Sequence, residues 1–571
     1  MLDLAVKYAY LWWRTLELNR FLASAKRSQE IQRKSLFAKL NRHAPSTFGI
    51  DHGFADIRTV GEYRRRIPIT NFEYYQSYID QVKQGRVSAM YGPGTKVLMF
   101  AITSGTTNQT KYVPVTQESF DEYRHGWNLW GIGAYRDHPD LVSKKTLKLG
   151  SNCRQFLTES GTPCGAISGL VAETAPWIAR SRFVLPSAVY QIDDSFVKHY
   201  VALRLAIANP HVGMIGTANP STLIEFARML NDQRENLIRD IHDGTLFFAD
   251  RLPAGVRLAL QSHFFQRSRP RAQSLERIVD QVGTLYPRDV WPELSVIAVW
   301  MGGSVSVYIP KLEPYYGQPA IRDHGLNASE ARMTMPLRDG TSEGVIEFNH
   351  HFYEFVPVSE IDANEPVVLE AHELEEGQDY YILLTTSAGL YRYDIRDVVR
   401  CTGFMGQAPL LVFLNKGAHF SSITGEKLSE YQVISAVKRA QEQVQLDVGE
   451  FCVAPQMQDR PVYVLMTESA FEIEDQDKLA QCIDHWLGQL NYEYAEKRRS
   501  GRLLPLTLRQ VSPGTWLALR KNKSAARGNF EEYKHRWLVG DLGYIDQITK
   551  NTSLVDNDKS NLGRKEAADR S

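Results

Sequence analysis

The sequence predicts an α/β protein that has a large N-terminal domain and a smaller, mobile C-terminal α/β domain. Three observations support this prediction. Short apolar runs alternate with longer helical patterns, which is typical of α/β folds with mostly parallel sheets. The length of 571 residues exceeds what a single hydrophobic core supports, so at least two domains are expected. The pattern changes at Asn415-Lys416-Gly417, so we place the boundary there, with domains at 1–414 and 416–547.

The expected N-terminal domain begins with helices and continues with alternating strands and helices. Apolar positions at three- and four-residue spacing predict helices, and short apolar runs bounded by Gly or polar residues predict strands. The helices are expected at residues 1–45, 70–90, 118–134 and 220–230. The strands are expected at 96–101, 214–216, 294–300, 380–385, 390–393 and 410–414.

The expected C-terminal domain contains a helix from about Ser429, strands around Cys452 and 462–466, and a helix at 477–490. Residues 548–571 are polar and charged with few apolar side chains, so we expect a disordered tail.

Charge and cysteine content limit the possible partners. Lys plus Arg and Asp plus Glu each number 66, so no net charge attracts nucleic acid, and we expect no nucleic-acid partner. The cysteines are odd in number, sparse and without a CxxC pair, which favours a reduced, cytoplasmic compartment with neither a disulfide framework nor a zinc site. They are Cys153, Cys164, Cys401, Cys452 and Cys482.

The N-terminus is apolar only in patches such as Leu11-Trp12-Trp13. Charged residues at Asp3, Lys7 and Arg14 interrupt it, so it has neither a signal-peptide core nor a membrane span. An amphipathic helix packed on the body and a helix lying on a membrane surface both fit this pattern. We expect no stable membrane insertion.

A polar loop after the strand at 96–101 is the strongest local signal. Hydroxyls and backbone N–H groups around a glycine can hold phosphates, and a nearby lysine adds positive charge. The spacing does not match the GxxxxGK[ST] loop, so a P-loop NTPase is excluded, whereas a polar surface turn remains an alternative. The candidate phosphate-binding residues are Thr103, Ser104, Gly105, Thr106, Thr107 and Lys111.

Two further segments carry single carboxylates. Glu330 follows small polar residues, Asn327-Ala328-Ser329, and such a carboxylate can hold Mg²⁺ together with phosphate oxygens. The alternative is a helix-capping serine beside a surface glutamate. Asp397, in Tyr391-Arg392-Tyr393-Asp394-Ile395-Arg396-Asp397, can accept both hydroxyls of a ribose. The alternative there is an exposed strand with alternating Arg and Asp.

In this order and at these distances, the three motifs resemble those of the ANL adenylating enzymes. They resemble more closely those of the GH3 family of acyl-acid amido synthetases, first known from auxin-responsive plant proteins. The resemblance extends over nearly the whole chain except the tail. Further matching segments are Phe48-Gly49 with His52-Gly53-Phe54, Ile67-Pro68-Ile69, Asn219-Pro220-Ser221-Thr222-Leu223 and Thr402-Gly403-Phe404.

The resemblance implies an ATP-dependent, AMP-forming ligase that uses Mg²⁺. Such an enzyme activates a small carboxylic acid as acyl-AMP and transfers the acyl group to an amino acid or another amine. The phosphates would contact the loop at 103–111, Mg²⁺ would bind Glu330, and the ribose would bind Asp397. Gly302, Gly303 and Ser304 would line the adenine pocket, beside Asn327, Ala328 and Ser329.

The same resemblance implies a catalytic lysine from the small domain, for which Lys427 and Lys534 are the candidates; either is otherwise a solvated surface lysine. Small-domain rotation about the boundary would bring this lysine in for adenylation and remove it for transfer. The acyl pocket is not identified, because Phe120, Tyr123, Trp127 and Trp130 at helical spacing fit either a pocket wall or core packing.

The sequence departs from the family pattern at four positions. Asn108 and Arg396 stand where glycine is usual, and Leu326 and Asn327 stand where Tyr and a small residue are usual. Two alternatives stay open: an acyl-CoA ligase, since ANL ligases more often use coenzyme A as the acceptor, and a catalytically silent nucleotide-binding protein if Asn108, Asn327 and Arg396 abolish turnover.

Overall fold

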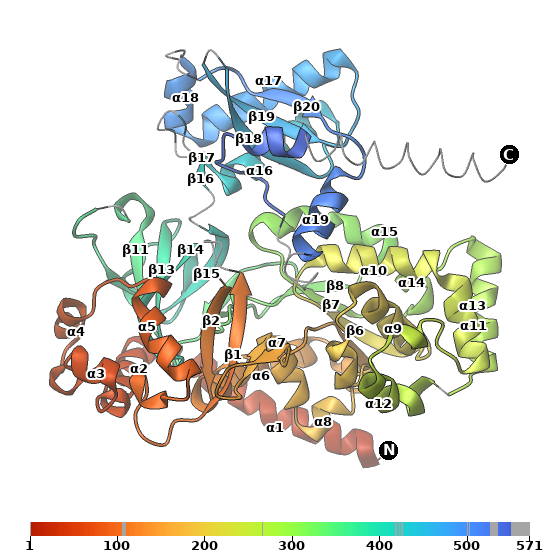
Figure 1. The fold of residues 1–571 in the computed structure, drawn as a ribbon, viewed down its shortest axis with the longest axis horizontal. Helices are drawn as coiled ribbons and strands as arrows, with labels where there is room; N and C mark the ends of the chain where they lie inside the picture. Colours follow the sequence, from red (N-terminus) through yellow and green to blue (C-terminus); the bar gives the residue numbers. More distant parts are fainter. Residues whose placement is uncertain are drawn as a thin grey trace. The chain divides into compact units, whose positions relative to one another are not determined.

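The computed structural model divides into two compact units, Met1–Leu414 and Asn415–Ser571, which are considered separately (Figure 1). The expected α/β class, with a large N-terminal and a smaller C-terminal domain, is confirmed. The structure describes residues 2–104, 110–264, 266–361, 363–416, 420–421, 423, 426, 428–458, 460–499, 501, 503–525 and 535–549.

One sheet of the N-terminal unit is parallel, in the order β3-β6-β7-β8. Its strands are β3 (Lys145–Lys148), β6 (Val212–Gly216), β7 (Val296–Val299) and β8 (Ala320–Asp323). Helices α9 (Ser195–Ile207), α10 (Pro220–Asp232) and α13 (Arg269–Val282) belong to the connections; α9 and α10 lie near these strands, whereas α13 lies farther out, beside α11 (Arg234–Asp243) (Figure 1). All five residues of β6 are buried, as expected for a strand with both faces covered.

A second sheet has seven strands in the order β12-β11-β13-β14-β15-β10-β9, and its described pairings are antiparallel. The expectation of mostly parallel sheets is wrong for this part of the chain. The turn between β13 and β14 contains Gly389 at φ +82°, and the turn between β14 and β15 contains Gly406 at φ +63°. Such short connections can join only antiparallel neighbours. The strands are β9 (Thr334–Met335), β10 (Gly344–Ile346), β11 (Phe352–Pro357), β12 (Leu369–Glu370), β13 (Asp379–Thr386), β14 (Leu390–Met405) and β15 (Ala408–Lys416).

A third sheet, in the order β2-β1-β5-β4, contains the hairpin of β1 (Val97–Ser104) and β2 (Thr110–Thr116), with β5 (Pro163–Gly165) and β4 (Phe156–Leu157) beside it. Helix α6 (Gln117–Asp137) follows β2 directly. It begins at Thr116 because the Thr116 hydroxyl accepts a hydrogen bond from the Ser119 N–H at 3.0 Å. Helix α5 (Phe72–Lys83) begins in the same way at Asn71.

The expected N-terminal helices are α1 (Leu2–Ser24) and α2 (Ser28–His43). Leu18 and Phe21 of α1 are buried in the main core, so this helix packs on the body as an amphipathic helix does. Trp12 and Trp13 are 68% and 58% exposed on its outer side. Within the described residues, no helix has the length and apolar character needed to span a membrane.

The remaining helices of this unit are short or lie at its periphery. The α-helices are α3 (Thr47–Asp51), α4 (Val60–Arg66), α7 (Ile167–Glu173), α8 (Trp177–Arg180), α11 (Arg234–Asp243), α12 (Ala254–Phe264), α14 (Pro287–Val290) and α15 (Glu313–Tyr316). The 3-10 helices are η1 (Ala25–Arg27), η2 (Phe54–Asp56), η3 (Val87–Ala89), η4 (Pro139–Val142), η5 (Ser187–Gln191), η6 (Ala249–Arg251), η7 (Gly303–Tyr308), η8 (Pro310–Leu312), η9 (Val358–Glu360) and η10 (Ala371–Glu373).

The C-terminal unit is a small α/β domain with its own core, which includes Trp516 and Ile548. Helix α16 begins after Ser429, whose hydroxyl caps it. Ile548 is 1% exposed, so the ordered core reaches the first residue of the expected tail, and residues 550–571 lie outside the described part. The elements are β16 (Phe420–Ser421), β17 (Leu428–Ser429), α16 (Glu430–Val444), β18 (Phe451–Met457), β19 (Pro461–Thr467), α17 (Ile473–Leu490), α18 (Tyr492–Arg499), β20 (Thr507–Gln510) and α19 (Thr515–Ala525).

Candidate active site

The candidate phosphate loop is the tip of the β1–β2 hairpin. Thr103 pairs with Lys111 and Ser104 pairs with Thr110, so the strands hold both ends of the loop. Gly105, Thr106 and Thr107 lie outside the described residues, as do the side chains of Thr103 and Ser104. The Lys111 ammonium lies 5.4 Å from the ring centroid of Phe72, at the start of α5. The paired strands therefore place a cation, Lys111, beside the base of the loop.

The expected adenine-pocket glycines follow β7. Gly303 has φ +64°, which favours glycine. A Cβ at Gly303 would lie 2.8 Å from the Phe413 ring, and one at Gly302 would lie 3.3 Å from the Phe413 carbonyl oxygen. Packing against β15 thus already requires small residues here, whether or not a base binds. The side chain of Ser304 lies outside the described part.

Asp323, at the end of β8, connects this loop to the second motif. Its carboxylate accepts hydrogen bonds from the backbone N–H groups of Met301 and, at 2.5 Å, Gly325. Burial raises the pKa of Asp323 to about 6, while these backbone bonds and the Arg332 charge oppose the rise. One buried carboxylate thus fixes the ends of two neighbouring loops.

The second motif is a tight turn. The Ala328 N–H donates to the Ala331 carbonyl at 2.8 Å, and the Asn327 amide donates to the Gly325 carbonyl at 3.0 Å. Glu330 is 7% exposed, and its carboxylate lies 3.5 Å from the hydroxyl of Tyr393. The structure therefore brings the second and third motifs together. It does not place Ser329 against a described partner side chain.

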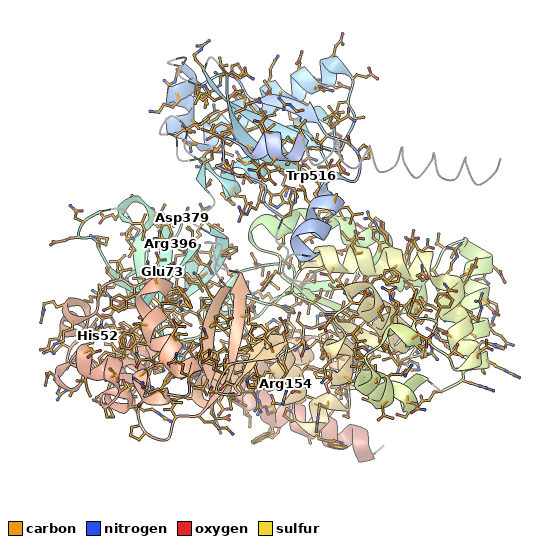
Figure 2. All side chains as sticks on the ribbon, in the orientation of Figure 1. His52, Glu73, Arg154, Asp379, Arg396 and Trp516 are labelled. Atoms are coloured by element: carbon orange, nitrogen blue, oxygen red, sulfur yellow. The ribbon has the colours of Figure 1, made fainter. Side chains whose placement is uncertain are left out.

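The third motif occupies a bulge in β14. Leu383 of β13 pairs with Asp394 and Tyr381 pairs with Val398, so three residues of β14 face one residue of β13. The bulge contains Asp397, which is 3% exposed. Figure 2 labels Arg396 on this strand.

Arg396 has φ +63°, the left-handed conformation that favours glycine. The Arg396 N–H donates to Asp394 at 2.8 Å, and its Nε lies 3.0 Å from the same carboxylate. The resemblance has glycine at this position. The backbone therefore keeps the conformation that glycine would supply, and the departure alters only the side chain.

Ion pairs to the buried Glu354 hold β14 in place. Glu354 of β11 is 1% exposed and accepts from Arg64 Nε at 2.8 Å and Arg392 Nε at 3.0 Å. The Tyr75 hydroxyl donates to the Tyr391 carbonyl at 2.6 Å. These contacts fix the residues that precede Asp397 in the chain.

Two cations, the buried Arg332 and the partly exposed Lys148, lie between α6, β3 and the second motif. The Arg332 guanidinium lies 3.9 Å and the Lys148 ammonium 5.5 Å from the ring centroid of Trp127. Arg332 is fully buried; its Nη2 donates to the His324 carbonyl at 2.6 Å, while its Nε and Nη1 have no described hydrogen-bond partner. No carboxylate of the described residues forms an ion pair with Lys148.

These surroundings disfavour the charged forms of Lys148 and Arg332. Burial lowers the pKa of Lys148 to about 8, with the Arg332 charge adding to the effect, and burial lowers the pKa of Arg332 to about 10. Buried donors without partners are costly, so they indicate a place for an anion. One indirect signal in the sequence is Gly126 in the middle of α6, because a Cβ there would lie 2.7 Å from the Arg332 side chain.

The aromatic residues of α6 divide between the two expected roles. Phe120 and Trp130 are buried in core clusters, as core packing predicts. Trp127 is only partly buried; it packs against the cluster that contains Trp130 and also contacts the two cations, as a site wall would.

Both candidate lysines of the small domain, Lys427 and Lys534, lie outside the described residues. Next to Lys427, Glu426 is fully buried; its carboxylate accepts from the Tyr463 hydroxyl, and its carbonyl accepts from the Asn491 amide at 2.9 Å.

Family models match three successive parts of the chain. The GH3 family N-terminal domain matches residues 17–321, the GH3 family central domain matches 344–416, and the GH3 family C-terminal domain matches 431–542. The chain belongs to the GH3 family. The resemblance stated from the motifs is thereby confirmed.

Relatives of this GH3 protein are similar over nearly their whole length. An indole-3-acetic acid-amido synthetase of Oryza sativa subsp. indica is 25% identical over 539 residues, which cover 88% of this chain and 87% of the relative. A jasmonoyl–L-amino acid synthetase of Nicotiana attenuata is 24% identical, covering 88% of each. The solved structure of the GH3.15 acyl acid amido synthetase superposes with a TM-score of 0.82 at 20% identity, over 94% of this chain and 95% of that one.

Proposed function

We propose that this GH3 protein is an ATP-dependent acyl acid amido synthetase. It activates a small carboxylic acid as acyl-AMP, releases pyrophosphate, and transfers the acyl group to the amine of an amino acid. The observation that carries the proposal is the match of the GH3 models along residues 17–542, together with full-length relatives named as amido synthetases. The five free cysteines favour a reducing compartment, so we place the reaction in the cytoplasm.

The nucleotide is held by the three motifs of the N-terminal unit. Asp397 accepts the ribose hydroxyls, and Glu330 holds Mg²⁺, which suits a single buried carboxylate in a tight turn because Mg²⁺ takes its other ligands from phosphate and water. When bound, Mg²⁺ neutralises phosphate charge. Gly302, Gly303 and Ser304 line the adenine pocket, and Asn327, Ala328 and Ser329 lie beside it. The phosphates bind Thr103, Ser104, Gly105, Thr106, Thr107 and Lys111.

The acid is received by Lys148 and Arg332. Its carboxylate must approach the α-phosphate, which is also an anion, so a cationic surrounding lowers the barrier by reducing their repulsion. The Nε and Nη1 donors of Arg332 and the unpaired charge of Lys148 fit a carboxylate, and the Trp127 ring gives the acid an apolar wall. In this chain, positioning and charge neutralisation supply the catalysis.

The C-terminal domain supplies the remaining cation. A further cation is needed because adenylation places additional negative charge on the phosphates. We take Lys534 for this role, with Lys427 as the second candidate. Transfer to an amine needs that space open, and movement of the small domain provides it.

Pyrophosphate release is the test. The full chain is incubated with ATP, Mg²⁺ and a panel of carboxylic acids, then with amino acids, other amines and coenzyme A, and the products are identified by mass spectrometry. Acid-dependent pyrophosphate and an acyl-amide product are expected. An acyl-CoA product would replace the amide synthetase with an acyl-CoA ligase. ATP binding without pyrophosphate from any acid would make the protein a silent nucleotide binder.

A further inference from the structure

The structure gathers two histidines and a glutamate that the proposed reaction does not use. His125 lies on α6, and Glu347 and His350 lie in the turn that follows β10. One candidate ligand atom of each lies within 4.8 Å of the other two. Imidazole nitrogen and carboxylate oxygen are the ligands that divalent transition metals take most often from N/O sites.

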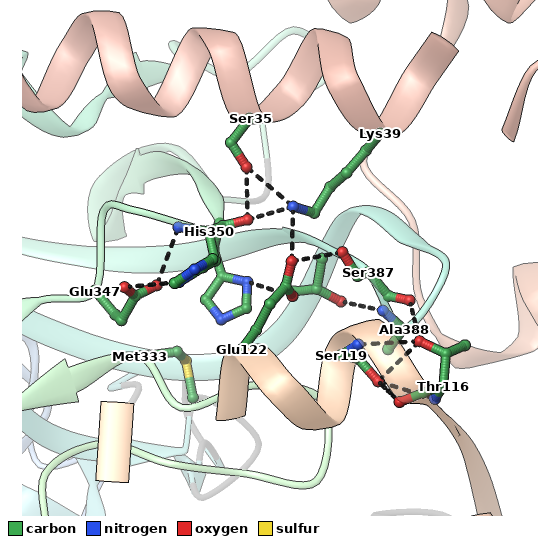
Figure 3. Close-up of polar contacts among 12 residues, drawn as sticks. Ser35, Lys39, Thr116, Ser119, Glu122, Met333, Glu347, His350, Ser387 and Ala388 are labelled. Atoms are coloured by element: carbon green, nitrogen blue, oxygen red, sulfur yellow. Dashed lines mark hydrogen bonds and ion pairs between the residues drawn. The ribbon is translucent and has the colours of Figure 1, made fainter. Parts of the chain in front are cut away.

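The turn after β10 holds two of these residues in place. His350 Nδ1 lies 3.1 Å from Glu347 Oε1, and the His350 backbone N–H donates to Glu347 Oε2 at 3.2 Å. Figure 3 shows that the His350 carbonyl in turn accepts from Lys39 and, at 2.6 Å, from Ser35, both on α2. The pair is therefore positioned before any ion binds.

His125 supplies the third nitrogen. Its Nδ1 lies 3.4 Å from a Glu17 carboxylate oxygen, whereas its Nε2 is buried with no hydrogen-bond partner in the described part. A carboxylate on one ring nitrogen is the usual arrangement behind a metal-bound histidine, because it fixes the tautomer and leaves the other nitrogen basic. Within the described residues this Nε2 has no partner to displace, and one ring nitrogen of His125 lies within 4.8 Å of the ligand atoms of Glu347 and His350.

The nearby cations have their own partners. Lys39 lies 3.2 Å from the buried Glu122, whose carboxylate also accepts from Ser387 (Figure 3). Arg14 lies 3.1 Å from Glu17. A carboxylate therefore offsets the charge of each cation, so Lys39 and Arg14 do not exclude a divalent ion from the cluster.

We propose that His125, Glu347 and His350 bind a zinc ion. Tetrahedral zinc ligands about 2.1 Å from the metal lie about 3.4 Å from one another, and the Glu347–His350 contact of 3.1 Å is close to that spacing. The His125 ring closes the remaining gap by rotation. Its side chain is 24% exposed and that of His350 is 32% exposed, so the ion enters from solvent and water completes the coordination. The ion joins α6 to the β10–β11 turn.

Metal titration of the full chain tests this proposal independently of amide synthesis. EDTA-treated protein is titrated with Zn²⁺ against a chromophoric chelator, and with Co²⁺ followed by absorption. One equivalent of Zn²⁺ is expected to bind and to raise the melting temperature. Co²⁺ is expected to give d–d bands without a sulfur charge-transfer band. His125→Gln and His350→Gln should each weaken zinc binding at least tenfold, and Glu17→Gln about tenfold.

His138→Gln is the matched control, since His138 is also a partly buried histidine with a carboxylate partner, Asp339 at 2.7 Å, but belongs to no cluster of three such ligands among the described residues. It should bind zinc as the unaltered chain does. Absence of stoichiometric binding, equal affinity in His125→Gln, or equal loss in His138→Gln would each overturn the proposal. A sulfur-to-cobalt band would overturn it as well, by assigning the ion to a cysteine.

Discussion

Replacing Lys148 with Met should make the protein more stable and less active. Burial lowers the pKa of Lys148 to about 8 from an ordinary 10.5. At about 1.4 kcal/mol for each pH unit, keeping this lysine charged costs the folded state about 3 kcal/mol below pH 8. The side chain is partly exposed, and Met loses the contact of the ammonium with Trp127, so we expect a net gain of roughly 1–2 kcal/mol at pH 7.

The sign of the pH dependence follows from the same values. Between pH 8 and 10.5 the unfolded chain keeps the proton on Lys148 while the folded protein has lost it, so the cost disappears over that range. The advantage of Lys148→Met over the unaltered protein should therefore shrink as pH rises above 8. Urea unfolding at pH 7 and at higher pH measures this difference.

The activity change separates this effect from general damage. Loss of a charged hydrogen-bonding partner is worth about 1.5–3 kcal/mol, so KM for the acid should rise ten- to a hundredfold. Lys145→Met is the control: it lies on the same strand, and its ammonium donates to the Ser181 carbonyl at 2.7 Å. A Lys148→Met protein that is no more stable at pH 7, or whose gain is independent of pH, would refute the reasoning.

Four further outcomes are expected. Asp397→Asn should reduce ATP affinity or turnover about ten- to a hundredfold, and unchanged ATP kinetics in a folded variant would remove Asp397 from the ribose site. Lys534→Ala should impair acyl-AMP formation but spare transfer from synthetic acyl-AMP; equal loss of both half-reactions contradicts it. Glu354→Gln leaves two arginines facing an uncharged amide, so urea unfolding should show a loss of about 3–5 kcal/mol, and a loss under 1 kcal/mol would show that the pairs do not matter. Burial lowers the pKa of His199 to about 4 and that of His351 to about 3, so the unfolded chain binds protons first and the free energy of unfolding should fall as pH drops below 6.5. His199→Phe should reduce this pH dependence, and an unchanged pH dependence would contradict the explanation.

The local elements were predictable because their causes are local. Thr116 and Ser429 cap α6 and α16, and Gly406 turns the chain from β14 into β15, each through a signal carried by one or two neighbouring residues. The antiparallel pairing of the seven-stranded sheet was not expected. The alternating pattern upstream suggested parallel strands, although the short connections beside Gly389 already excluded them.

The Lys148–Arg332 pair and the histidine cluster could not be predicted, because their members meet only in three dimensions. Lys148 and Arg332 are far apart in sequence, and each has an ordinary alternative on a strand or a loop. His125 and Glu347 are equally distant in the chain, and the cysteine pattern on which the zinc expectation rested says nothing about them. By contrast, Glu330 and Asp397 lie in recognisable sequence motifs, so both could be named from the sequence. Their roles remain proposals.

The left-handed backbone of β14 determines which sequences this strand can accept. At Arg396 the side chain is half exposed and the φ of +63° is the dominant constraint, so saturation mutagenesis should recover Gly and Asn while rejecting Val, Ile and Thr. At Arg392, with φ +50°, the backbone allows the same substitutions, but the guanidinium bound to Glu354 cannot be replaced. Two positions four residues apart thus share one conformation, yet the main chain limits substitution at Arg396 and the side chain limits it at Arg392.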